Sequence, residues 1–308
     1  MADIRYFGYA AESTFKTTVA AARYVDQVRS GIEGDRGWIA SDTVEKRART
    51  KFKLGAWLGR GPLDTIVEPE NVTSLFKWLL GAVTTTGAGP YTHVFKTGDD
   101  ILSFTGRLGA NLRERLLGGC LLESARFEAR AGRGDAGLLR ATWEILGTKI
   151  ESDGAIGSPT FSTLTPFVWH EGTVTLNAVN KSTQVKRFAL EYRNNIPIDD
   201  LYAFSTTEPT LIRVGRADIT CDMDIQFDDT AQYDLFKNGT EFAAKFDFVH
   251  TTTPYQLTFE MPKVVYRAAV PNPDRREQIV IPASMEARHD TTEATALKIT
   301  LINQQSAA

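Results

Sequence analysis

The sequence has few of the residues that cysteine, metal or nucleophile chemistry needs. Only two cysteines occur in 308 residues, Cys120 and Cys221, and the four histidines are scattered without metal-ligand spacing. No nucleophile elbow, phosphate-binding loop or dinucleotide-binding glycine pattern is present. We therefore expect no enzyme, no cofactor and no metal. The two cysteines are interpreted as buried thiols outside any disulfide framework, and their redox state stays open.

Long apolar runs and an excess of charge are also lacking. No stretch approaches the roughly 18 apolar residues of a membrane-spanning helix, and the N-terminus lacks the basic-then-apolar pattern of a secretory signal. The net charge of −3 argues against general affinity for nucleic acid. It still allows a surface that nucleic acid passes without binding. Synthesis and folding in a cytoplasm are expected.

What is present is the composition of an ordinary globular protein, with 42% hydrophobic and 24% charged residues, and a length that suits about two domains. An internal similarity points to the same number. Residues 127–130 (Phe-Glu-Ala-Arg) match residues 285–288 (Met-Glu-Ala-Arg). Residues 139–142 (Leu-Arg-Ala-Thr) match residues 297–300 (Leu-Lys-Ile-Thr) at the same separation.

Weaker matches upstream keep the same order along the chain and nearly the same separation. A period this long does not indicate a solenoid, so we predict two copies of one domain in tandem. The predicted parts are a first module at 1–150, a linker rich in glycine, serine and proline at 151–166, and a second module at 167–308.

Alternation of apolar and polar residues predicts that both halves consist mostly of strands. The clearest pattern lies in residues 119–147, where a turn rich in glycine and aspartate joins two alternating runs, so we predict a β-hairpin there. The matching residues 282–303 predict a second hairpin. Residues 173–179 and 185–192 predict a third, around Asn180.

Each half also contains one short predicted helix. In the first half Asn71 is a good N-cap, Leu75, Phe76, Leu79 and Leu80 follow at helical spacing, and Gly81 would end the helix. In the second half residues 230–237 occupy the corresponding place. This segment is less apolar, so the helix signal is weaker.

Acidic residues lie on one face of the clearest strand, residues 216–228. Its apolar side chains alternate with Asp218, Asp222, Asp224 and Asp228. The pattern allows a solvated strand face, a calcium site or a wall facing a polyanion, and calcium is the least favoured because a straight strand aims its ligands in parallel. The internal similarity aligns Asp64 with Asp224 and Glu68 with Asp228. The candidate set is therefore Asp64, Glu68, Asp222, Asp224 and Asp228.

A charged run in residues 41–53 has few apolar residues. It can be an exposed loop or hairpin tip, or an arm that docks onto an acidic neighbour. The candidate arm residues are Glu45, Lys46, Arg47, Arg49, Lys51 and Lys53.

Two stretches resemble a known family. Residues 69–95, PENVTSLFKWLLGAVTTTGAGPYTHVF, and residues 119–147, GCLLESARFEARAGRGDAGLLRATWEILG, are similar to the tail tube proteins of long-tailed (siphovirus-type) bacteriophages, of the larger type that holds two tandem modules. The resemblance implies a mainly β fold, with two tandem copies of a β-sandwich or barrel module. Each copy has one flanking α-helix, and the inner sheets close into a ring-shaped barrel on oligomerisation.

The resemblance further implies a structural virion protein, assembled in the host cytoplasm and located in the virion tail. Its rings stack into a tube that encloses the tape-measure protein and conducts DNA, which passes without specific binding. The expected partners are the chain itself, the tape-measure protein, the tail terminator and the baseplate or distal tail proteins. Two fused modules favour three chains per pseudo-six-fold ring, and six chains remain the alternative.

Other functions are kept open. The chain can be a ring component that does not stack, such as a terminator, a head–tail connector or a baseplate hub. A two-domain β-sandwich binding module would need exposed aromatic residues beside carboxylates, and only Trp169, His170 and Glu171 form such a cluster. A glycosidase would need a carboxylate pair, but Glu128 and Glu286 alternate with arginines on strands, which favours cross-strand ion pairs.

Overall fold

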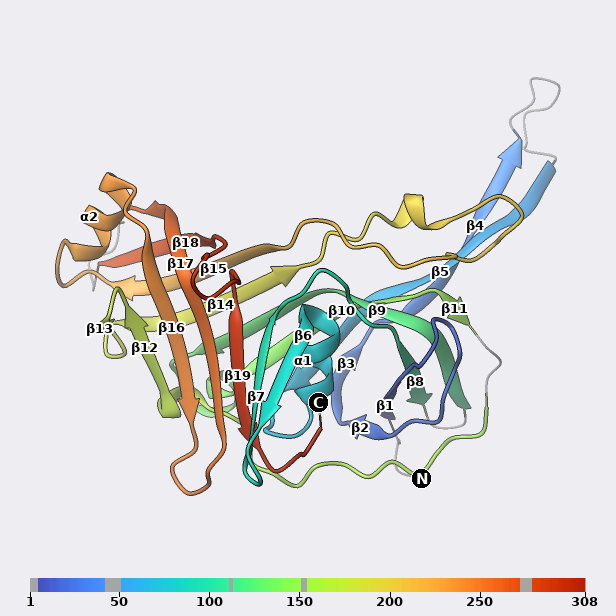
Figure 1. Ribbon diagram of the computed structural model, residues 1–308, viewed down its shortest axis with the longest axis horizontal. Helices are drawn as coiled ribbons and strands as arrows, with labels where there is room; N and C mark the ends of the chain where they lie inside the picture. Colours follow the sequence, from blue (N-terminus) through green and yellow to red (C-terminus); the bar gives the residue numbers. More distant parts are fainter. Residues whose placement is uncertain (1–4, 42–50, 111–112, 151–153, 272–278, 308) are drawn as a thin grey trace.

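A computed structural model describes residues 5–41, 51–110, 113–150, 154–271 and 279–307. The described chain is mainly β, as predicted, and its strands form one large open sheet that folds over itself (Figure 1). Its helices are α1 (Thr73–Leu80) and α2 (Ala231–Asn238), and short 3₁₀ turns occur at Gly134–Gly137, Trp169–Glu171 and Ile198–Leu201. Within the described residues, neither helix is long and apolar enough to cross a membrane.

Long strands from both halves of the chain lie side by side in the centre of the molecule. Four come from the first half and four from the second, and neighbours in the order given pair antiparallel. We call this array the central sheet: β3 (Gln27–Ser30), β5 (Lys51–Ile66), β10 (Arg140–Gly147), β9 (Arg113–Arg130), β14 (Val185–Arg193), β15 (Asp218–Gln226), β18 (Val280–Ala287) and β17 (Gln256–Ala269).

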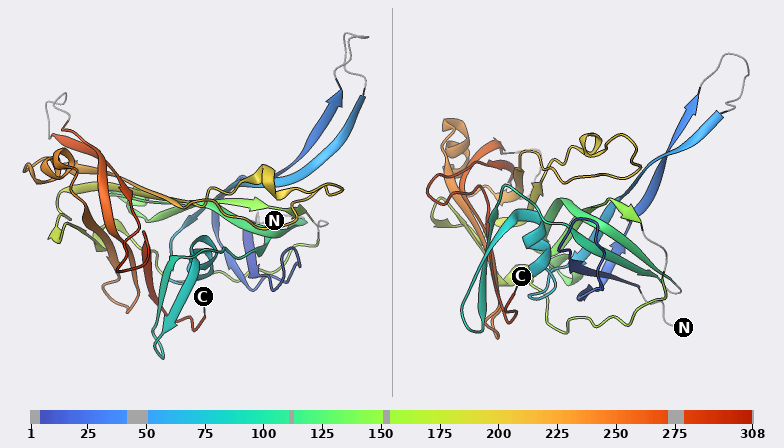
Figure 2. Two further views of the ribbon diagram at one scale, coloured as in Figure 1. Left: turned by 45° about the horizontal axis from the view of Figure 1, so that its top comes forward. Right: turned by 45° about the vertical axis from the view of Figure 1, so that its right-hand side comes forward.

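The two halves meet inside the central sheet at β9 and β14. The pairing runs from Arg130 opposite Arg187 to Ser124 opposite Arg193, without a bulge. Main-chain hydrogen bonds therefore join the halves into one continuous surface, which Figure 2 shows as a long curved band.

Apart from β4 (Glu33–Ser41), which pairs with β5, the remaining strands cover one side of the central sheet (Figure 2). β9 and β17 each continue from the central sheet into this covering layer. The first part of β9 pairs with a group near the N-terminus, namely β1 (Arg5–Ala11), β2 (Arg23–Val25), β8 (Phe104–Ala110) and β11 (Lys149–Ile150). The first part of β17 joins β12 (Gly172–Leu176), β13 (Val179–Asn180), β16 (Phe242–Val249), β19 (Lys298–Asn303), β7 (Tyr91–Thr97) and β6 (Gly81–Thr86).

Helix α1 fills the space between the two layers. The Phe76 ring lies 5.5 Å from the Phe127 ring, 5.8 Å from that of Trp143 and 6.2 Å from that of Phe259, measured between centroids. All four side chains are buried. Because Phe259 belongs to the second half of the chain, a single apolar core holds both halves together.

The start of α1 differs from the prediction. The N-cap position is Val72, and no side chain caps the helix. Asn71 instead closes the preceding turn, because its side chain accepts a hydrogen bond from the Glu68 N–H (2.9 Å) and donates one to the Ile66 carbonyl (2.9 Å). The end is as predicted, since Gly81 follows the helix with φ 89° and donates to the Lys77 carbonyl.

Of the predicted hairpins, the one at 119–147 is confirmed, with Glu128 opposite Arg140. The hairpin at 282–303 is wrong, because β18 pairs with β15 and β17 whereas β19 pairs with β17 and β7. The hairpin around Asn180 is also wrong, because β12 pairs with β16 and β14 lies between β9 and β15. Alternation identifies a strand and its faces, but the partner of a strand is chosen by contacts far along the chain.

Candidate functional site

The central sheet has one apolar face and one polar face. On β9, β14 and β15 the buried side chains Phe127, Leu190 and Met223 point into the core that contains α1. The residues between them point away from that core. This second side is the polar face, and its polar side chains are Arg29, Asp64, Ser124, Arg126, Glu128, Arg130, Arg140, Thr142, Glu144, Arg187, Glu191, Arg193, Asp218, Thr220, Asp222, Asp224, Gln226, Ser284 and Glu286.

One row of facing residues crosses the polar face without interruption. It contains, in order of contact, Asp64, Thr142, Arg126, Glu191, Thr220 and Glu286. Thr142 donates a hydrogen bond to the Asp64 carboxylate at 2.7 Å. The predicted residues Asp64, Asp222 and Asp224 therefore lie on the same face of the same sheet, although they come from different halves of the chain.

The other two predicted acidic residues lie just beyond strand ends. Because β5 and β15 run in the same direction, Glu68 and Asp228 follow them at the same end of the sheet. Asp228 is exposed and accepts hydrogen bonds from the Gln226 and Gln184 side chains at 2.8 and 3.3 Å. Glu68 is half-buried, and burial raises the pKa of its carboxyl group.

The middle of the polar face has mixed charge. Arg187 lies 2.8 Å from Glu128, Arg193 lies 2.6 Å from Glu191, and Arg126 reaches both carboxylates. Burial raises the pKa of Glu128, but the hydrogen bonds and charges of Arg187 and Arg126 together outweigh burial and bring that pKa below its ordinary value. The acidic face predicted from β15 thus continues into a network of ion pairs on β9 and β14. This network confirms the cross-strand ion pair predicted for Glu128 and identifies Arg187 as its partner.

A long hairpin arm extends from one end of the central sheet (Figure 1). It consists of β4 (Glu33–Ser41) and the first part of β5, paired from Glu33 opposite Arg60 to Ser41 opposite Lys51. The predicted residues Lys51 and Lys53 are exposed on it. The predicted residues Glu45, Lys46, Arg47 and Arg49 lie outside the described residues.

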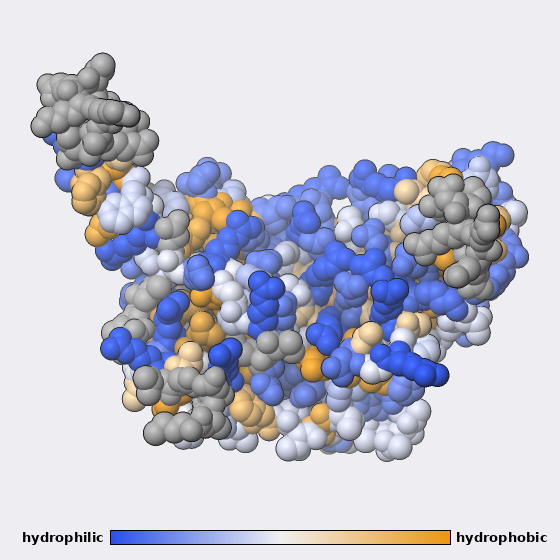
Figure 3. Space-filling view, turned by 180° about the vertical axis from the view of Figure 1, so that it is seen from behind, coloured by the Kyte–Doolittle hydropathy of each residue, from blue (hydrophilic) through white to orange (hydrophobic). Residues whose placement is uncertain are grey.

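The arm also carries apolar side chains that the sequence reasoning missed. Trp38 and Phe52 are 64% and 68% exposed, and their rings pack edge to face at 5.3 Å. Ile39 and Leu54 beside them are exposed as well. Hydrophobic atoms accordingly gather next to the grey tip in Figure 3, whereas the middle of that view is mostly hydrophilic. The available signal was a pair of strand-like apolar residues on each side of the charged run.

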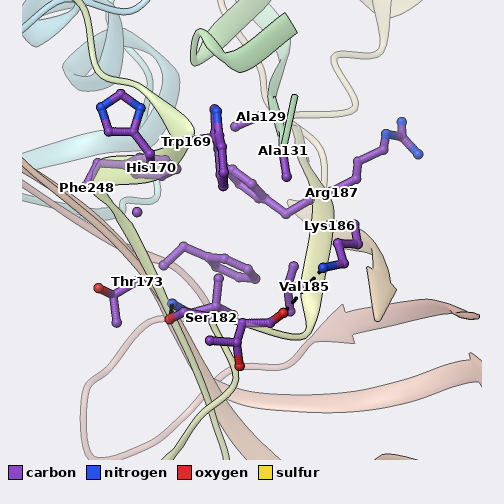
Figure 4. Close-up of a pocket in the computed structure, with 15 residues that line it drawn as sticks. Ala129, Ala131, Trp169, His170, Thr173, Ser182, Val185, Lys186, Arg187 and Phe248 are labelled. Carbon is purple, nitrogen blue, oxygen red and sulfur yellow. Dashed lines mark hydrogen bonds between the residues drawn. The ribbon is translucent and has the colours of Figure 1, made fainter. Parts of the chain in front are cut away.

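At the opposite end, an open cavity of about 460 Å³ lies between β14 and the covering layer. Trp169, Phe188, Phe246 and Phe248 line it, and the His170 ring lies apart from the other lining side chains (Figure 4). Glu171 does not line the cavity, since its side chain lies 3.8 Å from the His250 ring. Trp169, His170 and Glu171 therefore do not converge as a sugar-binding module would require.

Both cysteines are free and buried, and burial raises the pKa of each thiol. Cys120 lies on β9 and Cys221 on β15, where each packs into the main core.

Two comparisons with known proteins bear on this arrangement. The family model described as phage tail tube protein matches residues 4–287, which is most of the chain. No curated protein matches the chain. Because the family match spans the central sheet, the arm, α1 and α2, the chain belongs to the phage tail tube protein family, a family of structural proteins of the virion tail.

Proposed function

We propose that the protein polymerises as stacked rings into a phage tail tube that encloses the tape-measure protein and conducts DNA during ejection. The observation that carries the proposal is the central sheet, which combines strands from both halves of the chain. One of its faces lies in the core and the other face is polar. In the described residues, β3 and the part of β17 beyond Val264 have no partner strand on their outer edges. Open edges of this kind are usually paired, and closure into a ring pairs them all.

Two modules, 1–150 and 167–308, joined by residues 151–166, would each supply four strands to the ring. Three chains then give a pseudo-six-fold ring, with six chains as the alternative. Head-to-tail contacts that close form a ring, and rings that stack form a tube. Assembly in the host cytoplasm, with the tail terminator and baseplate or distal tail proteins at the two ends of the tube, completes the proposal.

In this arrangement the polar face lines the channel, with Asp64, Glu68, Asp222, Asp224 and Asp228 as its acidic candidates. Three of its arginines, Arg126, Arg187 and Arg193, are engaged by Glu128 and Glu191 of the same face. Cations held in this way offer little to DNA phosphates, and the remaining aspartates repel them. The channel would therefore let DNA slide.

The first experiment is negative-stain electron microscopy of the concentrated protein, with native mass spectrometry of the same sample. Hollow tubes with three chains per ring are expected. Six chains per ring would keep the function and remove the pseudo-symmetry, whereas rings that never stack would favour a terminator, connector or hub.

Reversing charge inside the channel tests the polar face. We expect the Asp222→Lys, Asp224→Lys double variant to assemble into tubes and to impair DNA delivery by the phage, because new cations would hold phosphates. The control is Asp234→Lys on helix α2, which is exposed and whose neighbour Gln232 bonds to Tyr266 of the apolar core instead of the polar face. Normal delivery by the channel variant, or failure of assembly, would count against the assignment.

Charge reversal on the arm tests stacking. If the arm bridges successive rings, Arg47→Glu, Arg49→Glu should leave single rings and block tube growth, which electron microscopy would show. Unchanged tubes would remove the bridging role from these residues.

A further inference from the structure

Strand pairing in the two halves shares irregularities at matching positions. The register of β3 against β5 shifts between Gln27 and Arg29, which face Thr65 and Asp64. The register of β14 against β15 shifts in the same way between Val185 and Arg187, which face Ile225 and Asp224. The same bulge therefore occurs in both pairs, and it aligns β3 with β14 and β5 with β15, position by position.

A second bulge recurs between β9 and β10. Ser124 faces Glu144 and Leu122 faces Ile145, which leaves Glu123 as the extra residue. In the second half Ala268 faces Ser284 and Tyr266 faces Met285, which leaves Arg267 as the extra residue. β17 thus corresponds to β9, with Ala268 at the position of Ser124, and β18 corresponds to β10.

A third bulge gives the same correspondence. Phe104 and Gly106 of β8 face Cys120 and Leu117 of β9. Phe242 and Ala244 of β16 face Val264 and Met261 of β17, so Val264 stands at the position of Cys120 in the same alignment of β17 with β9. The second and third bulges lie on opposite edges of β9 and of β17. Both give the same residue-by-residue alignment of β17 with β9, without a gap.

The match of residues 127–130 with 285–288 in the sequence aligns β9 with β18 instead, and the shared bulges correct it. Matching the two halves at one constant distance in sequence cannot allow for an inserted segment such as the β6–β7 hairpin, which follows α1. Among the described residues this hairpin has no counterpart after α2.

One strand pairing is made between the two halves of the chain, but the corresponding pairing at the outer edges of the central sheet is missing. β9 pairs with β14. The counterpart of β9 is β17, and the counterpart of β14 is the edge formed by β3 and the start of β4, residues 27–35. Within the described residues, β17 beyond Val264 and the 27–35 edge have no partner on their outer sides.

We propose that β17 of one copy pairs antiparallel with the 27–35 edge of the next copy, as β9 pairs with β14 within each copy. The partner is a second copy of this chain, and the register follows from the junction inside the chain. There Arg126 faces Glu191, so Val270 of one copy faces Glu33 of the next. The proposal rests on the proposed ring and names the strands that close it.

The side chains and shape of the two edges suit this pairing. Val270 is 54% exposed, and Ala268 and Glu33 are exposed too, so neither edge is covered by other parts of the described chain. Main-chain hydrogen bonds supply most of the attraction when a strand joins an open edge. Because the two edges differ, a pair of copies still has one free edge of each kind, and the contact repeats in one direction until a ring closes.

A disulfide between the facing positions tests the register. The Glu33→Cys, Val270→Cys variant, assembled and then oxidised, should give a ladder of covalently linked chains on a non-reducing denaturing gel. Mixing the two single variants should give linked dimers only, which shows that the bond joins different chains. The control is Glu33→Cys, Val179→Cys, because Val179 is 53% exposed on another edge strand, and this variant should stay monomeric on the gel.

Electron microscopy of the same samples separates this inference from the proposed function. Rings or tubes that show no cross-link at Val270, or that cross-link equally at Val179, would overturn the edge pairing and leave the tail tube role standing. Absence of rings and tubes from the unmodified protein, also with tail initiation proteins added, would overturn the proposed function itself.

Discussion

The helices α1 and α2 occupy corresponding places in the two halves, yet α1 is buried in the core and α2 is mostly exposed. Every residue of α1 except Lys77 is buried, whereas only Gln232 is buried in α2. The β6–β7 hairpin and β19 cover α1, while α2 lies at the far end of the molecule against β17 (Figure 1). The same element thus serves as a core filler where the halves meet and as an edge element at the far end.

The largest expected effect comes from emptying the α1 site. We expect Phe76→Ala to lower the free energy of unfolding by about 3–5 kcal/mol, because it leaves a cavity among four aromatic rings. The matched change Phe236→Ala in α2 should cost about 1 kcal/mol or less, since that ring is only partly buried. Urea denaturation of the unpolymerised chain measures both, and equal losses would contradict the comparison.

A polar cluster extends the comparison to the covering layer. In the first half the buried Glu114 accepts hydrogen bonds from Tyr6 and Arg107, and burial together with the Glu114 bond raises the pKa of Tyr6 to about 12. The shared bulges place Thr258 and Lys245 of the second half at the positions of Glu114 and Arg107.

There Asp247 supplies the carboxylate, which accepts a hydrogen bond from Thr258 (2.6 Å) and pairs with Lys245 (2.9 Å). The Lys245 side chain is 42% exposed, so water reaches this second cluster more readily than the first.

Removing the carboxylate of Glu114 or of Asp247 measures how much each polar cluster stabilises the fold. Glu114→Ala should cost about 3 kcal/mol, because it leaves the largely buried Arg107 and Tyr6 groups without their partner. Asp247→Ala should cost about 1–2 kcal/mol, because water can reach Lys245. Thermal unfolding compares the two, with Glu114→Gln as a control that keeps the shape. A larger loss for Asp247→Ala would reverse the comparison.

The smallest expected effect concerns two carboxylates on the polar face. The pKa of Glu128 is lowered in the fold, so its ion pairs stabilise the protein at neutral pH, and that contribution disappears as the pH falls through the folded pKa. Burial, opposed by Arg60, raises the pKa of Glu144, so ionised Glu144 destabilises the fold at neutral pH and this penalty disappears on acidification.

At neutral pH, Glu128→Gln should therefore lower the free energy of unfolding and Glu144→Gln should raise it, each by less than about 1 kcal/mol, because both groups are partly solvated. The Glu144 difference should vanish at a pH of about 3, whereas the Glu128 difference should only shrink there, because its folded pKa is lowered. Urea titrations at the two pH values check the signs, and effects of the same sign at neutral pH would contradict the assignment.

Local patterns predicted the elements well. Alternation gave the strand at β15 and both strands of the 119–147 hairpin, and Gly81 gave the end of α1. Local patterns failed where a side chain had a choice of nearby partners, as when Asn71 closed a turn instead of capping the helix. They also failed for β12, β14, β18 and β19, because a strand edge can pair with any other edge of suitable length.

The candidate site was predictable only in part. Asp222 and Asp224 were predicted to share a face from alternation, and Asp64 was added from the internal similarity. Their common face depends on the registers of the strands between them. The cross-strand ion pairs predicted for Glu128 and Glu286 are confirmed, with Arg187 and Arg267 as partners. The identity of these partners could not be predicted, because they lie on neighbouring strands whose pairing is set far along the chain. The exposed Trp38 and Phe52 were missed because apolar strand residues are usually buried.

Local sequence patterns suffice for the mainly β character, the short helices, the faces of the strands and the family resemblance, because each depends on near neighbours in the chain or on a recognisable stretch. Strand pairing, the burial of one helix and the correspondence of the two halves emerge only when the chain is folded. Those choices depend on hydrogen bonds and packing between residues far apart in the sequence, as between Phe76 and Phe259. An inserted hairpin changes such correspondences without altering any local pattern.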